Sequence, residues 1–422
     1  MTKLSTLKGV CDVLPPEIYT WNRIEETSKE VFKSFGFHEV KIPVIEHSEL
    51  FIRSIGETTD IVGKEMYTFM DKGGRSITLR PEGTAGMVRS YVENNLHLLP
   101  SPQKFHYYGP MFRYERPQKG RLRQFYQIGV EALGSASPLV DAEVITMAHT
   151  FFQKLNLTNL TIELNSIGCN KCRGTYRNAI VEFFSKKGVL CNDCQVRIAK
   201  NPLRMLDCKV ERCVEQRTGA PVILDYICEE CKTHHERLKE LLTAINIDYK
   251  ENPHIVRGLD YYNRTAFEIT TEHLGAQKAV AAGGRYDNLV SDFNGPATPA
   301  VGFAIGIERL VALVGVTQNQ NNPVFYIAPL GKDAEDKAFV LSQSLRQRAI
   351  VTECGDGLHS LKNHLKRADK LNASFVVIIG ENELKTSQVL CKRLSDAFQK
   401  EIGIDDIDTL IAFAAEKPGA TA

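Results

Sequence analysis

A regular spacing of apolar positions near the start of the chain predicts an amphipathic helix over residues 17 to 35. The apolar side chains recur at helical intervals and so share one face, formed by Trp21, Ile24, Val31, Phe32 and Phe35. Gly36 follows at once, and glycine often marks the end of a helix. We expect this face to be buried against the rest of a domain.

The segment VKIPVIEHSELF, residues 40 to 51, has the pattern of a β-strand. Pro43 lies inside it, and proline cannot donate a hydrogen bond to a neighbouring strand. The pattern therefore indicates an edge strand or a bulge. Such an edge could meet a second subunit.

Two strand-like runs between His106 and Gly134 flank the polar segment RPQKGR and predict an antiparallel hairpin. Side chains alternate between the two faces of a strand. One face of the second run is thus polar, with Arg123, Phe125, Gln127 and Glu131, whereas the other has Tyr126, Ile128 and Val130. In the first run Arg113 and Glu115 share a face by the same rule.

This polar face suits a nucleotide. Arginine binds phosphate oxygens through two parallel bonds, a flat ring stacks on a purine, and a carboxylate or its neighbouring backbone can read an exocyclic amine. For any one of these residues, a solvated face of an ordinary hairpin is an equally good interpretation. Their combination favours a binding site.

Residues 165 to 235 hold eight of the eleven cysteines and interrupt the strand pattern, which indicates an inserted module. Cys169 and Cys172, followed by Cys191 and Cys194, have nearly the spacing of a structural zinc site. A second tetrahedral set is available in Cys208, Cys213, Cys228 and Cys231. The alternative is that these thiols are simply buried.

Strand character resumes at Ile255 and continues through AAGGRY to GFAIGIERLVALVG, which predicts a helix approached through glycine. Residues 319 to 323 have the polar composition of a linker. Beyond them strand and helix patterns alternate, which is typical of a small α/β domain with a largely parallel sheet.

Composition narrows the class of protein without fixing its activity. The chain has 422 residues, enough for two or three domains, with 43% hydrophobic and 24% charged residues. It contains no uninterrupted apolar stretch long enough to span a bilayer, and its first residues lack the apolar region of an export signal. We therefore expect a cytoplasmic protein without a membrane partner. The net charge of +1 neither requires nor excludes a nucleic acid.

Several segments resemble the motifs of class II aminoacyl-tRNA synthetases. FRYERPQKGRLRQF is similar to motif 2, GFAIGIERL to motif 3, and VKIPVIEHSELF to motif 1, which in that class lies at the dimer interface. RGLDYYNRTAFE, AAGGRYDNLV and TLRPEGT resemble the histidine-specific members. The resemblance to the histidyl-tRNA synthetase family covers essentially the whole chain, and the cysteine-rich insertion is its least specific part.

The resemblance implies a role for each matched residue. Arg113 would hold the α-phosphate of ATP, Glu115 and Phe125 the adenine, and Arg309 the γ-phosphate. The histidine pocket would comprise Glu82, Gly83, Thr84, Arg113, Gln127, Glu131, Arg257, Tyr261 and Tyr262. Arg113 and Arg257 would be catalytic, because they neutralise charge where the carboxylate meets the α-phosphate. Gly283 and Gly284 would let the backbone approach the substrate.

The resemblance also implies partners and a fold. These partners are ATP with Mg²⁺, L-histidine, tRNA(His) and a second copy of the chain in a homodimer. The loop residues Arg116, Gln118, Lys119 and Arg121 would meet the acceptor end of the RNA. The expected fold is an α+β catalytic domain over residues 1–322 with a mostly antiparallel sheet flanked by helices. It has a small insertion at about 165–250, and an α/β anticodon-binding domain follows over 323–422.

Two other functions fit parts of the sequence. One is a catalytically inert relative that senses histidine, which predicts lost motif residues and no C-terminal RNA-binding domain. Arg113, Arg257 and Arg309 are all present, and so is the α/β tail, where His359, Lys362, His364, Lys366 and Arg367 form a cationic cluster. The other is an unrelated ATP-dependent ligase, which would not need the RGLDYY and GGRYD segments. Histidine-dependent exchange of ATP and pyrophosphate distinguishes all three.

Overall fold

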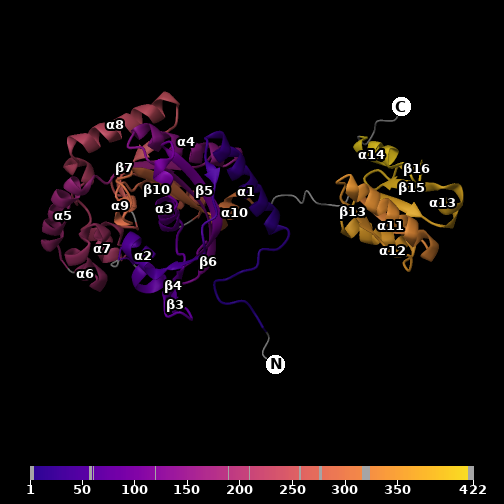
Figure 1. Ribbon diagram of the computed structural model, residues 1–422, viewed down its shortest axis with the longest axis horizontal. Coiled ribbons are helices and arrows are strands. Elements are labelled where there is room, and N and C mark those ends of the chain that lie inside the picture. The colour runs from indigo at the N-terminus through magenta and orange to yellow at the C-terminus, as the bar shows by residue number, and fades with distance from the viewer. Residues whose placement is uncertain are drawn as a thin grey trace. The chain divides into compact units, whose positions relative to one another are not determined.

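The computed structural model describes residues 4–56, 59, 61–118, 120–188, 190–208, 210–255, 258–274, 278–315 and 324–416. The chain forms two compact units, Met1–Thr317 and Gln318–Ala422 (Figure 1). Lys119, Arg257 and the predicted linker at residues 319 to 323 lie outside the described residues.

The larger unit, here called the catalytic unit, is built on an eight-stranded sheet (Figure 1). In spatial order its strands are β1 (His38–Glu39), β5 (Gln103–Phe112), β6 (Gln124–Leu133), β11 (Ala300–Gly306), β10 (Ala279–Arg285), β9 (Asn263–Thr270), β7 (Thr161–Ser166) and β8 (Tyr249–Glu251). Neighbouring strands are antiparallel except at the two edges, where β1 pairs with β5 and β8 with β7 in parallel. The predicted hairpin and the mostly antiparallel sheet are confirmed.

Four helices pack on one face of this sheet. They are α1 (Glu17–Ser34), α4 (Pro138–Lys154), α8 (Glu229–Ala244) and α10 (Ile307–Val314). The predicted first helix is confirmed, and its Phe32 is fully buried with its ring edge-on to Phe303 of β11. The segment GFAIGIERLVALVG, predicted to be a helix approached through glycine, contains a strand and a helix. Gly302 to Gly306 belong to β11, and helix α10 begins at Ile307.

The opposite face of the sheet carries a second, tyrosine-rich core. Helices α3 (Thr84–Glu93) and α9 (Leu289–Asp292) pack there, and the short turn η2 (Leu96–Leu98) follows α3. Tyr107, Tyr261, Tyr262 and Tyr286 are each buried within this core. One face of the sheet is therefore a conventional apolar core, whereas the other combines aromatic rings with polar groups.

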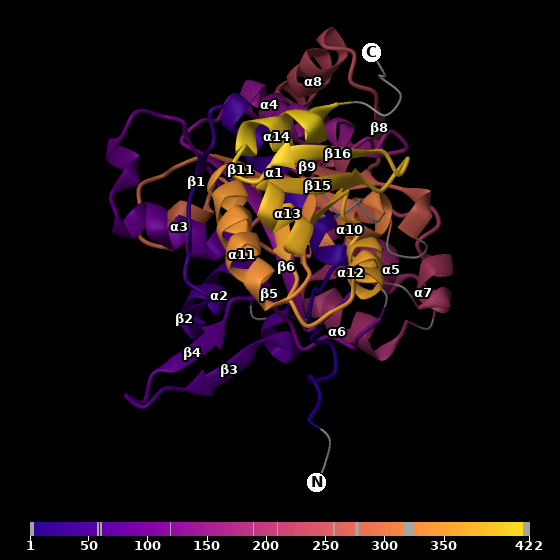
Figure 2. The ribbon, with the colours of Figure 1, turned by 90° about the vertical axis from the view of Figure 1, so that its right-hand side faces the viewer.

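The single strand predicted for residues 40 to 51 is wrong. The segment begins just after β1 and contains an extended stretch with Pro43, then β2 (Ile45–His47) and the start of α2 (Ser48–Ile55). Strand β2 leaves the main sheet and pairs with β4 (Ser76–Leu79), which also pairs with β3 (Tyr67–Met70) after η1 (Ile61–Glu65). Proline interrupts the strand because it cannot donate to a ladder. Figure 2 shows β2, β3 and β4 projecting from the main sheet.

The insertion between β7 and β8 is helical throughout its described elements. It comprises α5 (Asn170–Ser185), α6 (Asn192–Lys200), η3 (Pro202–Asp207), α7 (Glu211–Gln216), η4 (Ile223–Tyr226) and α8. Its small core contains Tyr176, Ile180, Phe184 and several cysteines. Strand structure resumes after the insertion with β8. Ile255, where the sequence predicted it to resume, is not in a strand, and the next strand is β9; η5 (Glu272–Leu274) then precedes β10.

The smaller unit is an α/β domain with one five-stranded sheet. The strands in spatial order are β13 (Thr352–Cys354), β12 (Phe325–Pro329), β14 (Phe375–Ile379), β15 (Gln388–Arg393) and β16 (Gln399–Gly403). The helices are α11 (Lys332–Gln347), α12 (Leu361–Lys370), α13 (Glu381–Thr386) and α14 (Ile407–Ala415). β12 is parallel to β13 and β14, but β15 and β16 are antiparallel, so the prediction of a largely parallel sheet holds for only half of it.

Within the described residues, no helix combines the length and the hydrophobicity that crossing a lipid bilayer requires. The predicted fold class, an α+β unit with an insertion followed by an α/β unit, is confirmed.

Candidate functional site

A cavity of about 270 Å³ opens on the tyrosine-rich face of the catalytic unit. Strands β5, β6, β10 and β11, the start of α3 and the start of α10 contribute its walls. The lining includes most of the residues predicted for histidine and ATP: Glu82, Gly83, Thr84, Arg113, Glu115, Arg121, Phe125, Gln127, Tyr261, Tyr262 and Arg309. Residues separated by more than 200 positions therefore meet in one site.

A buried carboxylate cluster centred on Glu131 adjoins one end of this cavity. Glu131 does not itself line the cavity, but it is hydrogen-bonded to Thr84 and Tyr107, which do. Thr84 Oγ1 and Tyr107 Oη donate to Glu131 Oε1 at 2.7 and 3.0 Å, and the Tyr286 hydroxyl donates to Oε2. Glu82 accepts the backbone N–H groups of Thr84 and Ala85 at 2.6 and 3.0 Å, and so caps the start of α3. Hydrogen bonds thus fix the two carboxylates in place.

Burial dominates the electrostatics of this cluster. It raises the pKa of Glu131 to about 8, although hydrogen bonds from Tyr286 and Thr84 oppose the shift and the nearby charge of Glu82 adds to it. Burial also raises the pKa of Glu82, against the two backbone donors and Arg113. A cation that enters this end would favour the ionised carboxylates, so the cluster is chemically suited to an ammonium or imidazolium group.

Two tyrosines and an amide complete this end. The rings of Tyr261 and Tyr262 lie 4.6 Å apart between centroids, and Tyr261 packs edge-on against Tyr286 at 5.7 Å. Gln127 Oε1 is buried and makes no hydrogen bond to any described residue. Because a buried amide oxygen without a partner is costly, this acceptor is suited to a ligand N–H.

The other end of the cavity is cationic. Arg113 Nε donates to Pro81 O at 2.8 Å, and Arg309 Nη1 donates to Ala279 O at 2.7 Å, so backbone carbonyls orient both guanidinium groups. Arg121 Nη1 lies 3.1 Å from Glu115 Oε2. Burial lowers the pKa of Arg309, and the neighbouring Arg121 lowers it further. A polyanion would relieve this repulsion and replace the lost solvation.

An aromatic ring lies beside these arginines. Phe125, on the cavity side of β6, has the Arg113 guanidinium 5.2 Å from its ring centroid. Tyr126, next along the strand, instead packs edge-on against Trp21 in the helical core. The predicted division of this strand into a site face and a core face is therefore confirmed.

Glycines make room for the buried tyrosine of the cluster. A Cβ on Gly129 would lie 2.0 Å from the Tyr107 ring, and one on Gly83 would lie 2.2 Å from it. Gly283 and Gly284 serve the sheet instead of the substrate. A Cβ on Gly283 would lie 2.3 Å from Gly302 O, and neither glycine is among the residues that line the cavity. Their predicted approach to the substrate stays a prediction.

The loop between β5 and β6 places its side chains differently. Arg116 and Gln118 are exposed and do not line the cavity, whereas Arg121 does. Backbone hydrogen bonds of 3.1 and 2.9 Å join Gln118 and Arg121 across the loop. Lys119, predicted to meet the acceptor end of the RNA, and Arg257, predicted to be catalytic, lie outside the described residues.

Sequence reasoning missed three residues of this site. Tyr107 and Tyr286 bind Glu131, and Glu308 lines the cationic end and accepts the backbone N–H of Tyr126 at 2.9 Å. Tyr286 lies within the AAGGRYDNLV segment that carried the family resemblance, so a signal existed. Tyr107 faces Gly129 across the hairpin, and that pairing becomes visible only once the register is known.

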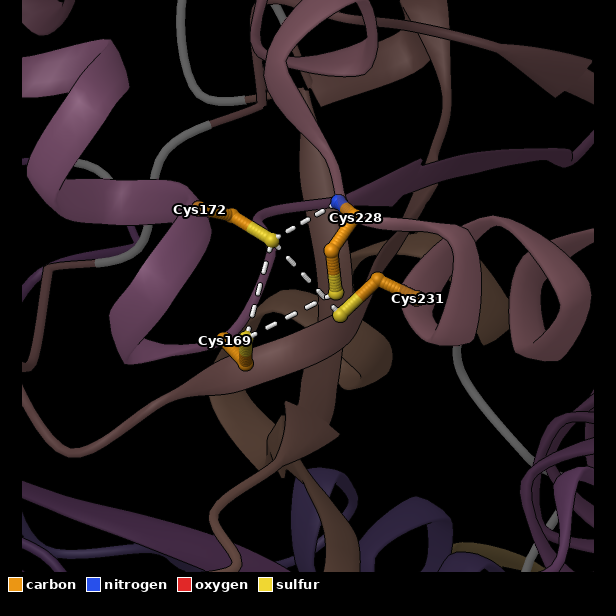
Figure 3. A group of neighbouring side chains, drawn as sticks. All are labelled: Cys169, Cys172, Cys228 and Cys231. Carbon is orange, nitrogen blue, oxygen red and sulfur yellow. Dashed lines mark hydrogen bonds between the residues drawn. The ribbon is translucent and has the colours of Figure 1, made fainter.

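The cysteines group differently from the predicted set Cys169, Cys172, Cys191 and Cys194, which is wrong. The first pair joins Cys228 and Cys231 (Figure 3), and the second pair joins Cys208 and Cys213. Sequence spacing misleads here because the two ends of the insertion come together at its base. The proximity is visible only in the folded chain.

One residue of the cationic cluster predicted for the smaller unit, His364, is not on the surface. His364 is buried, and its Nδ1 lies 2.9 Å from Tyr326 Oη, so it belongs to the core. Lys362, Lys366 and Arg367 of α12 remain exposed. His359 lies 2.6 Å from an Asp356 carboxylate oxygen.

Comparison with known proteins identifies the family to which this sequence and fold belong. The family model described as histidyl-tRNA synthetase matches residues 9–172 and 209–310, and one described as an anticodon binding domain matches 325–412. A histidine–tRNA ligase of Thermodesulfovibrio yellowstonii is 50% identical over 97% of this chain and 98% of its own length.

Two solved structures extend the comparison. The apo histidyl-tRNA synthetase of S. aureus is 34% identical, with a TM-score of 0.83 over 98% of this chain and 100% of the other. A structure from Bacillus halodurans, described as an ATP phosphoribosyltransferase regulatory subunit/histidyl-tRNA synthetase, is 19% identical over 89% and 98% of the two chains. Its TM-score is 0.66, so it shares the fold alone. Over nearly its whole length, the chain belongs to the histidyl-tRNA synthetase family.

Proposed function

We propose that the cavity of the catalytic unit is where histidine and ATP react before histidine is transferred to tRNA(His). The observation that carries this proposal is the charge division of one cavity. Glu82 lines one end, where the lining residue Thr84 donates to the buried Glu131, and Arg113, Arg121 and Arg309 line the other. An amino acid with a cationic ammonium and a triphosphate would bind at opposite ends and meet between them.

In the first step, a carboxylate oxygen of histidine attacks the α-phosphorus of ATP. The new oxygen–phosphorus bond gives histidyl-adenylate, and pyrophosphate leaves with the electrons of the broken bond. In the second step, a ribose hydroxyl of the terminal adenosine attacks the acyl carbon, and AMP leaves. Neither step requires a protein nucleophile, so catalysis comes from orientation and electrostatic stabilisation.

Each end would have a distinct task. Gln127, Glu131 and the tyrosine hydroxyls would hold the imidazole and ammonium groups of histidine through hydrogen bonds and charge. Phe125 would stack on adenine beside Glu115, and Arg309 would bind the γ-phosphate. Arg113 would bind the α-phosphate. We propose that Arg257 also neutralises the charge of this phosphate, where the histidine carboxylate attacks it.

Oxygen ligands suit Mg²⁺, and the cationic end contains the carboxylates of Glu115 and Glu308. These groups would share the ion with the phosphates of bound ATP. The ion would supply further neutralisation of phosphate charge. The pKa of Glu308 is raised by burial to about 7, and a bound cation would favour its ionised form.

RNA would be recognised at two places. The loop residues Arg116, Gln118, Lys119 and Arg121 would meet the acceptor end, because cationic and polar side chains contact both phosphates and unpaired bases. The smaller unit would bind the anticodon, and the exposed Lys362, Lys366 and Arg367 of α12 would supply phosphate contacts.

We also propose a homodimer that uses the sheet of β2, β3 and β4. Ile45 and Phe69 are 51% and 46% exposed, and the strand register puts both on one face of this sheet. Apolar side chains that share an exposed face indicate an interaction surface. Light scattering should give twice the chain mass, and Phe69→Asp should lower it toward the monomer, whereas the exposed control Leu358→Asp should not.

Pyrophosphate exchange tests the proposed reaction. The full chain should incorporate labelled pyrophosphate into ATP only when L-histidine is present. Exchange without histidine would favour an unrelated ATP-dependent ligase. Histidine binding without exchange would favour a sensor that has lost catalysis.

A further inference from the structure

The eight cysteines of the insertion form two separate groups of four. The neck cluster comprises Cys169, Cys172, Cys228 and Cys231, and it joins the two ends of the insertion at its base (Figure 3). The inner cluster comprises Cys191, Cys194, Cys208 and Cys213 and lies within the insertion's own core. In each cluster all four sulfur atoms lie within 4.8 Å of one another.

The sulfur separations match those of a mononuclear tetrahedral metal site. In the neck cluster, Cys169 Sγ lies 3.6 Å from Cys172 Sγ and 3.9 Å from Cys228 Sγ. Cys172 Sγ lies 3.8 Å from Cys231 Sγ, and in the inner cluster Cys191 Sγ lies 3.8 Å from Cys208 Sγ. Four sulfurs at the zinc–thiolate bond length of roughly 2.3 Å form a tetrahedron with edges of about 3.8 Å.

Other fates of closely spaced thiols fit this arrangement less well. A disulfide requires sulfurs about 2 Å apart, and none of the eleven cysteines, all of them described, forms one. In an iron–sulfur cluster the cysteine sulfurs bind several different irons and therefore lie further apart than on one central ion. Four thiolates at tetrahedral spacing are the usual ligand set of structural zinc.

The backbone around both clusters also suits thiolate ligands. Cys169, Cys191 and Cys228 lie at the N-caps of α5, α6 and α8, where the helix dipole favours negative charge. The N–H of Cys228 donates to Cys172 Sγ at 3.1 Å, and that of Cys191 donates to Cys213 Sγ at 3.3 Å. Such hydrogen bonds are the outer contacts that orient metal ligands.

We infer that each cluster binds one structural Zn²⁺, so that the chain holds two zinc ions in the insertion. Each thiol that becomes a ligand releases its proton to solvent, and four thiolates give each site a net charge of about −2. Arg173 is next in the chain to the ligand Cys172, and the charges that act on its guanidinium group are those of Asp260 and of the Cys169 and Cys172 thiolates. It therefore supplies part of the compensating charge.

The neck site has a second consequence, which rests on the proposed function of the cavity. Arg173 follows the ligand Cys172 and donates to Tyr262 O, the backbone of a residue that lines the cavity. Two backbone hydrogen bonds also connect the base of the insertion to β9. Ile167 N donates to Arg264 O at 2.7 Å, and Arg264 N donates to Gly168 O at 2.9 Å. Zinc in the neck cluster therefore positions one wall of the histidine pocket, whereas zinc in the inner cluster stabilises the insertion alone.

The metal content of the full chain, purified with a thiol reductant and without chelator, tests the two sites. We expect about two zinc per chain, and a mercurial reagent should release zinc in proportion to the cysteines it modifies. Less than about a tenth of an equivalent, iron in place of zinc, or disulfides found by mass spectrometry would each overturn the proposal.

A pair of double variants tests which cysteines share an ion. Cys169→Ser with Cys228→Ser removes ligands from one site only, so about one zinc should remain. Cys169→Ser with Cys191→Ser disrupts both sites and should leave almost none. The control Cys11→Ser, outside both clusters, should keep both ions. Loss of both ions from the first pair would overturn the assigned grouping.

Substitution of Co²⁺ for zinc tests the ligand sets in the unchanged chain, and so does not depend on whether the variants fold. The full chain, freed of zinc and given Co²⁺, should show the charge-transfer and ligand-field bands of tetrahedral thiolate coordination, with about two ions at saturation. An octahedral spectrum would contradict the ligand sets.

Kinetics separates the neck site from the histidine pocket. Cys231→Ser should raise the KM for histidine roughly tenfold and change the KM for ATP little, because a displaced wall misplaces one substrate. Cys208→Ser, in the inner cluster, should leave both values nearly unchanged. Equal effects of the two variants would remove the coupling to the pocket, and the metal counts are independent of whether the cavity binds histidine.

Discussion

The two ends of the cavity prepare for opposite charges by opposite means. Glu131 at the carboxylate end is fully buried, and burial raises the pKa of its carboxyl group to about 8, so without a cation beside it this group favours the protonated form below that pH. At the cationic end, backbone carbonyls fix Arg113 and Arg309, which stay charged whether or not a ligand is bound. We therefore expect the carboxylate end to lose a proton when it binds the cationic groups of histidine. The cationic end needs no change of protonation to bind the phosphates of ATP.

The largest expected effect concerns Arg257, to which the proposed reaction gives a catalytic role. Arg257→Lys should lower the rate of adenylate formation by roughly 10²-fold or more, because a lysine cannot replace a planar fork that bridges two anionic groups. The KM for ATP should change little. Pyrophosphate exchange measures both quantities, and near-normal exchange in this variant would remove Arg257 from the chemistry.

The carboxylate end should respond to pH. Because a cation requires ionised Glu131, we expect histidine affinity to rise with pH toward about 8, and Glu131→Gln should weaken binding and abolish this rise. Calorimetric titration of histidine between pH 6 and pH 8 measures it. A pH dependence that persists in the glutamine variant would assign the titration to another group.

The same raised pKa affects stability. A carboxyl whose pKa is higher in the folded state stabilises the fold at low pH, and this contribution is lost as pH rises through about 8. Without histidine, the free energy of unfolding of Glu131→Gln relative to the unchanged chain should therefore increase from pH 5 to pH 8. Denaturant titrations at both pH values test the sign, and a relative decrease would contradict it.

A smaller effect is expected at the aromatic ring of the cationic end. Phe125→Ala should raise the KM for ATP about tenfold, the scale of one lost stacking contact with a base. Tyr126→Phe is the matched control, since Tyr126 packs in the helical core and does not line the cavity. If both variants left the KM for ATP unchanged, adenine would have to bind elsewhere.

The smallest effect on exchange should come from removing the smaller unit. Both ends of the cavity belong to the catalytic unit, so a fragment ending at residue 322 should exchange pyrophosphate at nearly the normal rate. It should charge RNA poorly at RNA concentrations that suffice for the full chain. Equal charging would contradict an RNA-binding role, provided circular dichroism shows that the fragment is folded.

The sequence predicted the cavity better than the insertion because the two depend on different information. Strand alternation placed Phe125 and Gln127 on the site face, since that rule is local. The zinc ligand sets depend on which distant pairs meet, and Cys169 pairs with Cys228 instead of Cys191 because the insertion folds back to its base. Tyr107 was missed for a similar reason, because its place opposite Gly129 is a matter of register.

Predictions from local patterns also failed where the chain passes from one sheet to another and where a polar residue faces the core. Residues 40 to 51 have a strand-like composition, yet they leave one sheet and join another around Pro43. In α12, His364 looked like part of a cationic surface, but its position in the helix turns it toward Tyr326 and the core. Composition indicates an element, and packing decides which face is buried.

The most direct test of the division between the two ends is a comparison of two histidine analogues by calorimetry, without ATP. L-Histidinol keeps the imidazole and ammonium groups and lacks the carboxylate, whereas imidazole propionate keeps the carboxylate and lacks the ammonium. We predict that histidinol binds and competes with histidine, and that imidazole propionate binds roughly 10²-fold more weakly, because it leaves the buried carboxylates without a cation. Equal binding of both analogues, or tighter binding of imidazole propionate, would contradict the account.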